Sequence, residues 1–179
     1  MKKTLIVLAH PDMAHSRLNK ALIAAVKNEP GVTVRDLYAA YGSPDAIDVS
    51  EEQRLLLAHE RIVFQFPLYW YSTPGLLKEW QDRVLAYGFA YGSRGDRLAG
   101  KAFKIAATTG APEEAYAPDG AMGVTLGALF SPLRAMARLT QMTFTPPFVL
   151  CGASGIADEA VAEKARAYRA LLAHEHWEH

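Results

Sequence analysis

Short apolar runs recur along the chain and are separated by segments with helical spacing. Residues 4–9, 62–64 and 102–109 are mostly apolar, as expected for strands that are buried on both faces of a parallel sheet. Residues 32–37 alternate apolar with polar side chains, which indicates a more exposed strand. Residues 144–151 predict a fifth strand, with a proline pair near its start.

Helices are predicted between these strands. In the first half, Ser16 can cap a helix that Pro30 stops, because the apolar positions between them recur at helical spacing. Residues 38–49 are predicted to form a loop. Residues 50–53 match a capping box ahead of a short helix.

The second half continues the alternation. Residues 73–87 keep helical spacing, Pro132 marks a kink or a fresh start in a later helical segment, and Asp158 is placed to cap the last helix. Strands that alternate with helices predict an α/β fold. We expect a doubly wound, five-stranded parallel sheet with helices on both faces, in a single domain over residues 1–179.

Composition narrows the choice of partner. The 179 residues carry 19 Lys and Arg against 19 Asp and Glu, so the neutral chain has no overall attraction for nucleic acid or an acidic membrane surface. A small molecule is the expected partner. Cys151, the single cysteine, lies in an apolar run and is predicted to be a buried, unreactive thiol in a reducing compartment. The first apolar stretch is too short for a signal peptide or a membrane span, so a cytoplasmic protein is expected.

Three loops follow predicted strands, at residues 10–19, 67–74 and 108–116. The carboxyl ends of parallel strands meet at one edge of an open sheet, where ligands bind, so these loops are expected to form one crevice. The first loop leads into a helix whose free N–H groups favour a phosphate, and Arg17 adds a charged contact.

The other two loops suit a flat ring. Tyr69, Trp70 and Tyr71 offer rings on which a planar heterocycle could lie, although neighbouring aromatic residues can equally form a hydrophobic plug. Residues 108–110, Thr-Thr-Gly, offer hydroxyls and amides where glycine permits close approach. The dinucleotide fingerprint Gly-x-Gly-x-x-Gly does not occur. A phosphate beside a flat polar ring describes FMN better than a nicotinamide dinucleotide.

Five blocks of sequence, taken together, resemble a known family. They are His10-Pro11 with His15-Ser16-Arg17-Leu18-Asn19; Phe66-Pro67-Leu68-Tyr69-Trp70-Tyr71-Ser72 with Leu76-Leu77-Lys78-Glu79-Trp80 and Arg83-Val84; Gly88-Phe89-Ala90-Tyr91-Gly92; Gly100-Lys101; and Thr108-Thr109-Gly110. In this order they resemble the flavodoxin-like NAD(P)H:quinone oxidoreductases, and most of all the bacterial ancillary flavoproteins of glutathione-gated potassium-efflux systems. The resemblance implies a flavodoxin-like fold, a homodimer with flavin at the subunit interface, and two-electron reduction of quinones by NADH or NADPH in ping-pong fashion.

The resemblance also assigns roles to single residues. Tyr116 matches a tyrosine that sits over the flavin near the transferred hydride, and we predict that it acts in catalysis with Thr109 and Gly110, which could stabilise charge on the reduced ring. The alternative is that Tyr116 is an exposed loop aromatic. The predicted flavin-binding residues are His10, Ser16, Arg17, Leu18, Asn19, Pro67, Leu68, Tyr69, Trp70, Tyr71, Thr108, Thr109, Gly110 and Ala111.

Two positions depart from the family pattern. Met122 stands where the mammalian members have a histidine, and a thioether cannot relay a proton. Ala111 stands where a second glycine is common. Flavin binding should survive both changes, because backbone amides and rings carry it, whereas quinone turnover is less secure. FMN is expected rather than FAD, because the short chain lacks an evident extension to hold an adenosine half.

Another interpretation uses the histidines. Residues 9–12, Ala-His-Pro-Asp, resemble the opening of zinc-dependent N-acetylglucosamine deacetylases. Met13 stands in place of that family's second acidic residue, and a catalytic zinc ion needs three protein ligands, so no metal site is predicted. His174, His176 and His179 could bind metal adventitiously, but they are expected to belong to a frayed polar tail.

A third hypothesis is regulatory. The protein could dock on a potassium-efflux antiporter at the inner face of the cell membrane and use its flavin as a redox sensor, instead of or together with enzyme activity. A role as an electron-carrying flavodoxin fits less well, because those proteins are usually strongly acidic and this chain is neutral.

Overall fold

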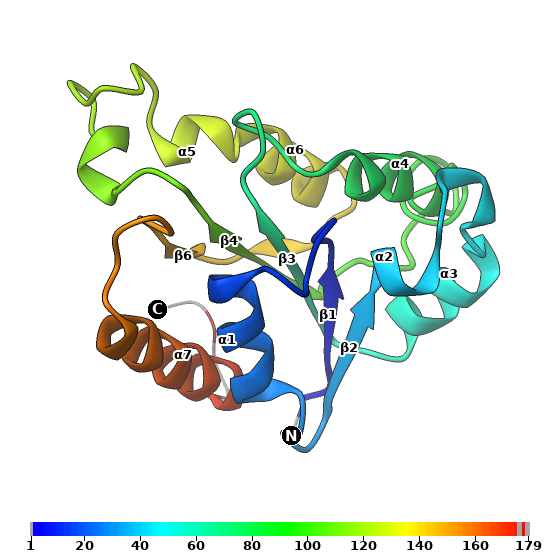
Figure 1. Cartoon of the computed structure of the whole chain (residues 1–179). Coiled ribbons are helices and arrows are strands. Elements are labelled where there is room, and N and C mark those ends of the chain that lie inside the picture. Colours follow the sequence, from blue (N-terminus) through cyan, green and yellow to red (C-terminus); the bar gives the residue numbers. More distant parts are fainter. Residues whose placement is uncertain (1, 175–176, 178–179) are drawn as a thin grey trace.

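The computed structural model describes residues 2–174 and 177, and its parallel sheet lies between two layers of helices (Figure 1). The strands are β1 Thr4–Leu8, β2 Val32–Asp36, β3 Arg61–Pro67, β4 Ala102–Thr108, β5 Thr143–Phe144 and β6 Phe148–Leu150. The order across the sheet is β2-β1-β3-β4-β5, and β6 also pairs with β4. All the pairings are parallel. The predicted α/β class and doubly wound sheet are confirmed.

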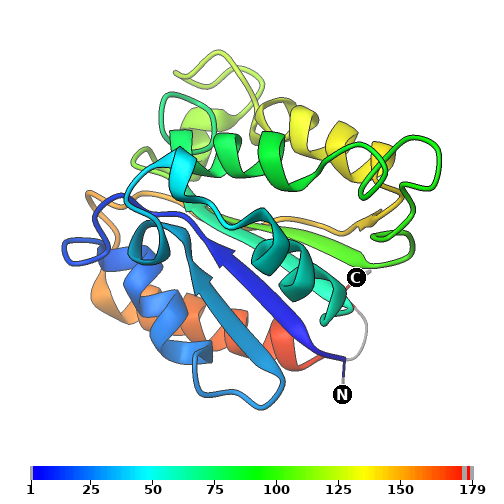
Figure 2. The same cartoon turned by 90° about the vertical axis from the view of Figure 1, so that its right-hand side faces the viewer.

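Helices cover both faces of the sheet (Figure 2). The α-helices are α1 Arg17–Val26, α2 Leu37–Ala40, α3 Val49–Leu57, α4 Gly75–Val84, α5 Leu126–Leu129, α6 Ser131–Leu139 and α7 Asp158–Ala173. Helices α1 and α7 pack on one face with Ile6 and Val63, whereas α3, α4 and α6 pack on the other with Phe64. Because each central strand is buried on both sides, its sequence is an almost continuous apolar run.

The fifth position of the sheet holds two short strands instead of the single predicted one. Strands β5 and β6 are separated by Thr145-Pro146-Pro147. Proline has no N–H to give to a ladder, so pairing with β4 stops at Phe144 and resumes at Phe148. The strand pair still places its carboxyl end at the same edge as the other strands.

Several predicted boundaries are wrong by a few residues. Residues 38–49 are not one loop, because they contain most of α2 and a 3₁₀ turn, Pro44–Ala46. Asp48 caps α3 by accepting from the Glu51 amide, so the capping box at residues 50–53 is not used. Ala157 is the N-cap of α7, and Asp158 is its first residue. The fresh helix start at Pro132 is confirmed, since α6 begins one residue before it.

The end of the chain is described only in part. His174 is the C-cap of α7, whereas His176 and His179 lie outside the described residues. Across residues 2–174 and 177, no helix is both long and apolar enough to cross a membrane.

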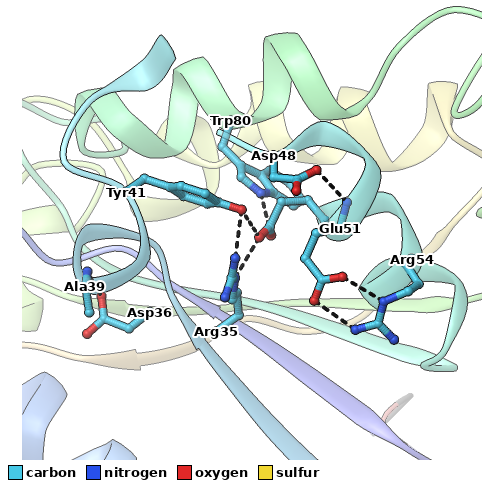
Figure 3. Close-up of polar contacts among 9 residues, drawn as sticks. Arg35, Asp36, Ala39, Tyr41, Asp48, Glu51, Arg54 and Trp80 are labelled. Carbon is cyan, nitrogen blue, oxygen red and sulfur yellow. Dashed lines mark hydrogen bonds and ion pairs between the residues drawn. The ribbon is translucent and has the colours of Figure 1, made fainter. Parts of the chain in front are cut away.

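A buried carboxylate joins the elements on the α3 and α4 face (Figure 3). Glu52 is fully buried; its Oε1 accepts from Arg35 Nε at 2.6 Å and from the Tyr41 hydroxyl at 2.7 Å. Its Oε2 accepts from Trp80 Nε1 at 2.9 Å. The Arg35 guanidinium also donates to the Tyr41 oxygen at 2.7 Å. The cluster therefore fixes α3 and α4 to β2.

Candidate functional site

The three predicted loops converge on one crevice at the carboxyl edge of the sheet. Its volume is about 390 Å³. Most of the predicted flavin-binding residues line it, namely His10, Ser16, Arg17, Leu18, Asn19, Pro67, Leu68, Tyr69, Thr108, Thr109 and Gly110. Trp70, Tyr71, Ala111 and Tyr116 are not part of its lining. The crevice lies beside the junction of β1 and β3, where the strand order changes direction and open α/β sheets bind ligands.

Ala153 also lines the crevice and was missed from the sequence. Its N–H donates to the Thr109 carbonyl at 2.9 Å, so the segment after β6 closes the crevice beside the third loop. The sequence could have indicated Ala153, because it follows the carboxyl end of the fifth predicted strand. Ligands bind at the carboxyl ends of the strands in open α/β sheets, so this segment was also a candidate.

The amino end of α1 presents unused donors to the crevice. Ser16 occupies the N-cap position, yet its side chain makes no capping hydrogen bond. The amides of Arg17, Leu18 and Asn19 belong to the first turn, which has no preceding carbonyls to pair with, and the described structure gives them no other acceptor. A row of free N–H groups with a hydroxyl beside it is a suitable site for a phosphate.

His10 is a buried donor at the back of the first loop. The Asp12 amide donates to its Nδ1 at 3.0 Å, so a neutral ring carries its proton on Nε2. Burial lowers the pKa of His10, while the negative charges of Asp12 and Asp36 act in the opposite direction. The ring is therefore favoured in its neutral form, which can give one N–H bond to a ligand.

The guanidinium of Arg17 is engaged by α7. Its Nε lies 3.1 Å from Asp158 Oδ1, and Nη2 bonds the same oxygen. The side chain of Asp158 is exposed, so this ion pair is weakly held. Arg17 lines the crevice as predicted, but in this structure its charge is directed at Asp158.

The second loop contains a strained two-residue turn. Tyr69 and Ser72 exchange both backbone hydrogen bonds at 3.0 Å, and the residues between them have positive φ angles, 47° for Trp70 and 63° for Tyr71. This left-handed conformation costs roughly 1–2 kcal/mol for each residue other than glycine. Strain of this kind is concentrated at functional sites.

The turn sends the three predicted rings in different directions. Tyr69 lines the crevice and meets His10 edge to face, with 6.2 Å between ring centroids. Trp70 is 93% exposed. The Tyr71 hydroxyl donates to Met122 Sδ at 3.6 Å. The hydrophobic-plug alternative is therefore wrong, because the largest ring of the three projects into solvent.

The third loop offers fewer donors than the sequence suggested. The Thr109 amide donates to the Leu150 carbonyl at 3.1 Å and its hydroxyl to the Ala111 carbonyl at 2.7 Å. Thr109 therefore cannot stabilise charge on a ring through its own donors. The amides of Gly110 and Ala111 make no hydrogen bond in the described structure, and a Cβ on Gly110 would meet no atom within 4 Å. These two amides are free to face a ligand.

Tyr116 lies in a 3₁₀ turn, Glu113–Tyr116, and is only 8% exposed, so the exposed-aromatic alternative is wrong. Burial raises the pKa of its hydroxyl. Cys151 is half-buried and not buried as predicted, but desolvation raises its pKa, as expected for an unreactive thiol. Among residues 2–174 and 177, no three His, Cys, Asp or Glu side chains gather to hold a metal ion.

A second cavity of about 490 Å³ adjoins the strained turn. It lies between α4 and the α5–α6 segment, and Leu68, Ser72 and Thr73 form part of its wall. Most of its other lining residues are apolar, and Leu139 at its edge is 61% exposed. An apolar groove therefore extends along the molecule from the second loop.

Comparison with known proteins agrees with this geometry. Residues 2–172 match the model of a family described by its flavodoxin-like fold. An uncharacterized NAD(P)H oxidoreductase of Bacillus subtilis, YdeQ, is 46% identical over 93% of this chain and 84% of its own. The ancillary protein KefG of a glutathione-regulated potassium-efflux system from Cronobacter sakazakii is 45% identical over 96% of this chain and 92% of its own. The resemblance seen in the sequence is confirmed.

Solved structures are similar along the whole fold. General stress protein 14 of Treponema denticola, in complex with FMN, has a TM-score of 0.90 and 40% identity over 95% of this chain and 97% of that one. An NADPH-quinone reductase from P. pentosaceus has a TM-score of 0.87 and 34% identity, and the match covers 97% of this chain and 99% of that one. A protein described as a thermophilic tryptophan halogenase from Streptomycin violaceusniger has a TM-score of 0.93 and 44% identity, and the match covers 96% of this chain and 99% of that one. The activities named for these proteins differ, so similarity alone does not identify the substrate.

Proposed function

The chain belongs to the family with a flavodoxin-like fold, and from that premise we propose that it is an FMN-dependent enzyme in which NAD(P)H reduces a quinone by two electrons. The observation that carries the proposal is the crevice, which is lined both by unused donors at the amino end of α1 and by Tyr69 at the start of the strained turn. A phosphate fits the first feature and a flat ring fits the second. The zinc-deacetylase interpretation has no support in this geometry.

The donor set suits FMN. The first turn of α1, the Ser16 hydroxyl and the Nε2 proton of His10 can all bond an anion. The one carboxylate in the lining, Asp12, already accepts from the His15 amide and ring. Leu68 and Tyr69 would lie against the ring, with the amides of Gly110 and Ala111 at its polar edge. The lining therefore offers a phosphate many donors and little repulsion.

The reaction needs little from ionisable side chains. When bound, the flavin supplies the chemistry by taking a hydride from NAD(P)H and passing two electrons to the acceptor. The protein orients the reactants. The free amides of Gly110 and Ala111 stabilise negative charge at the ring edge.

A quinone is the proposed acceptor. An NADPH-quinone reductase of P. pentosaceus shares 34% identity and nearly the whole fold, which supports this choice. The exposed ring of Trp70, which follows Tyr69 of the crevice lining in the chain, offers a flat apolar surface to an aromatic acceptor. Met122 cannot deliver a proton to the product, so we expect the proton to come from solvent.

The test is an anaerobic titration followed by visible absorption. The protein reconstituted with FMN should retain the yellow cofactor, bleach on addition of NADH or NADPH, and recover its colour when a soluble benzoquinone is added. The more effective nucleotide identifies the preferred reductant. Failure to retain FMN would contradict cofactor binding, whereas a reduced flavin that quinones do not reoxidise would contradict the choice of acceptor.

A regulatory role is the second candidate. The 45% identity with a KefG ancillary protein supports docking on a potassium-efflux antiporter, which would hold this protein at the inner face of the cell membrane. Co-purification of the flavin-loaded protein with detergent-solubilised antiporter would support it. Absence of binding in both flavin oxidation states would rule it out. Quinone turnover and docking are compatible, so each needs its own assay.

We also propose that the protein is a homodimer. The apolar groove beside α4 and α6, with Leu139 exposed at its edge, is a surface that a second copy could cover next to the crevice. Sedimentation equilibrium should give twice the chain mass, and Leu139→Glu should shift the protein towards monomer. A monomeric wild-type protein at micromolar concentration would contradict the proposal.

A further inference from the structure

Four buried polar side chains form a continuous hydrogen-bond chain behind the crevice. The Tyr168 hydroxyl on α7 donates to Gln65 Oε1 on β3 at 3.1 Å. Gln65 Nε2 donates to the Oδ1 and the carbonyl oxygen of Asn19 on α1, both at 3.3 Å. Asn19 Nδ2 donates to Thr108 Oγ1 at the end of β4 at 2.8 Å. The chain joins four elements that are distant in sequence.

A main-chain atom fixes the direction of this chain. The Asn19 carbonyl oxygen can only accept, so Gln65 must turn its NH₂ group towards Asn19 and its oxygen towards Tyr168. Tyr168 must then donate. Asn19 Oδ1 receives a bond from Gln65, which leaves Nδ2 to face Thr108. Each residue therefore donates a hydrogen bond to the next one, and the Thr108 hydroxyl accepts the last bond while its own proton stays available.

The last donor of the chain faces the crevice. Asn19 and Thr108 line the crevice, whereas Gln65 and Tyr168 are fully buried behind them. Within the described residues, no acceptor takes the proton of the Thr108 hydroxyl. An O–H group whose oxygen already accepts a hydrogen bond is polarised and becomes a better donor. The site thus presents an oriented hydroxyl beside the first turn of α1.

We propose that Gln65 and Tyr168 are positioning residues for the polar tail of the cofactor. They hold Asn19 and Thr108 so that the Thr108 hydroxyl donates to the ribityl phosphate part of FMN. This inference rests on the proposed binding of FMN. The ring is held by Leu68 and Tyr69 and by the amides of Gly110 and Ala111, and the described structure shows no hydrogen bond between these groups and the four side chains of the hydrogen-bond chain. The hydrogen-bond chain should therefore affect affinity for the tail and leave affinity for the ring unchanged.

Two substitutions break the chain in different ways. Tyr168→Phe removes the first donor and leaves Gln65 Oε1 buried without a partner, so the Gln65 amide is held from the Asn19 side alone. Gln65→Glu places acceptor oxygens against both oxygens of Asn19, whose amide must turn and present Oδ1 to Thr108. The Thr108 hydroxyl then donates backwards, away from the crevice. Thr145→Val is the control, because it removes a buried hydroxyl that bonds the Phe103 carbonyl at 3.1 Å and does not line the crevice.

Calorimetric titration of the flavin-free protein with three ligands tests the proposal. Lumiflavin carries the ring alone, riboflavin adds the ribityl chain, and FMN adds the phosphate. Tyr168→Phe should weaken FMN binding about threefold to tenfold, and Gln65→Glu should weaken it more, while lumiflavin binding changes by less than about twofold. Thr145→Val should lower the melting temperature and leave all three dissociation constants unchanged.

The three ligands separate the outcomes. A loss shared by riboflavin and FMN places the donor at the ribityl hydroxyls, and a loss for FMN alone places it at the phosphate; both support the proposal. Equal weakening of FMN and lumiflavin, or unchanged FMN binding by Tyr168→Phe, would overturn it. If Gln65→Glu does not fold, Tyr168→Phe decides alone. A wild-type protein that binds none of these flavins would instead refute the proposed function itself.

Discussion

Two buried polar networks lie on opposite faces of the sheet and end differently. In the first, donors from Arg35, Tyr41 and Trp80 converge on the two oxygens of Glu52 (Figure 3). In the second, the bonds run in one direction from Tyr168 to Thr108 and finish at the crevice. A convergent network satisfies its central group internally and so serves stability, whereas a directional one leaves a donor for a ligand. The burial of polar groups therefore does not by itself show whether a network stabilises the fold or prepares a donor for a ligand.

The largest effect should come from breaking the convergent network. Glu52→Ala leaves three buried or half-buried donors without an acceptor, and we expect a loss of about 3 kcal/mol in the free energy of unfolding. Urea denaturation measures this loss. The FMN affinity of the folded fraction should be unchanged, because the cluster does not line the crevice.

Glu51→Ala is the matched control for that experiment. Glu51 is the neighbouring residue on α3 and pairs with Arg54 at the surface, at 2.7 and 2.8 Å (Figure 3). An exposed pair of this kind contributes less than about 1 kcal/mol. If Glu51→Ala and Glu52→Ala destabilised the protein equally, burial would not explain the role of Glu52.

Breaking the directional network should change stability less and ligand binding more. Asn19→Ala leaves the Gln65 amide without its side-chain acceptor and Thr108 without its donor, which costs about 1–3 kcal/mol of stability. Because Asn19 and Thr108 line the crevice, FMN affinity should fall by about tenfold or more. Parallel denaturation and titration experiments compare the two losses. Unchanged FMN binding by Asn19→Ala would remove the functional difference between the networks.

The ion pair between Arg17 and Asp158 sharpens the comparison, because it has the same chemistry as Arg35 and Glu52 but is exposed. Asp158→Asn should change stability by less than about 1 kcal/mol. It should also raise FMN affinity, since Arg17 is released towards the crevice, and the gain should shrink as salt is added. Titrations at two salt concentrations measure both effects. Weaker FMN binding by Asp158→Asn would show that the pair supports the site.

The smallest effect should be a dependence of the free energy of unfolding on pH, which arises from His10 in the crevice. The pKa of His10 is lowered in the folded protein by burial, so the unfolded chain binds the proton more readily. The stability from this group is therefore present above the usual histidine pKa, near about 6.5, and is lost as the pH falls through that value towards the lower folded pKa. Urea denaturation between pH 7.5 and pH 5.5 should show a decline (roughly the histidine range), and His10→Gln should flatten it. An unchanged slope in that variant would assign the decline to another group.

The sequence predicted those parts of the molecule that depend on local pattern. The continuous runs identified the central strands, and the rule that ligands bind at the carboxyl edge brought His10, Ser16 and Thr108 to one crevice. Neither buried network was predicted. Tyr168 is a buried residue of α7 and its partner Gln65 is 103 residues away, so no local period connects them.

The second loop shows a different reason for failure. Its aromatic residues predicted a ring-binding surface, but the direction of each ring depends on backbone angles. Trp70 and Tyr71 occupy the left-handed region, which bulky residues seldom adopt, so no residue preference could have indicated the turn. The prolines at 146 and 147 were seen, yet their ability to divide a strand depended on which N–H groups face β4.

The exposure of Trp70 gives the molecule an optical property of its own. Of its three tryptophans, Trp80 and Trp177 are buried, and only Trp70 faces water. An indole in water emits at longer wavelengths than a buried one, and oxidised flavin absorbs in the region of that emission. The long-wavelength side of the fluorescence spectrum therefore reports on the turn that follows Tyr69 of the crevice lining, and the short-wavelength side reports on the core. One spectrum can follow occupation of the crevice and integrity of the fold at the same time, without an added label.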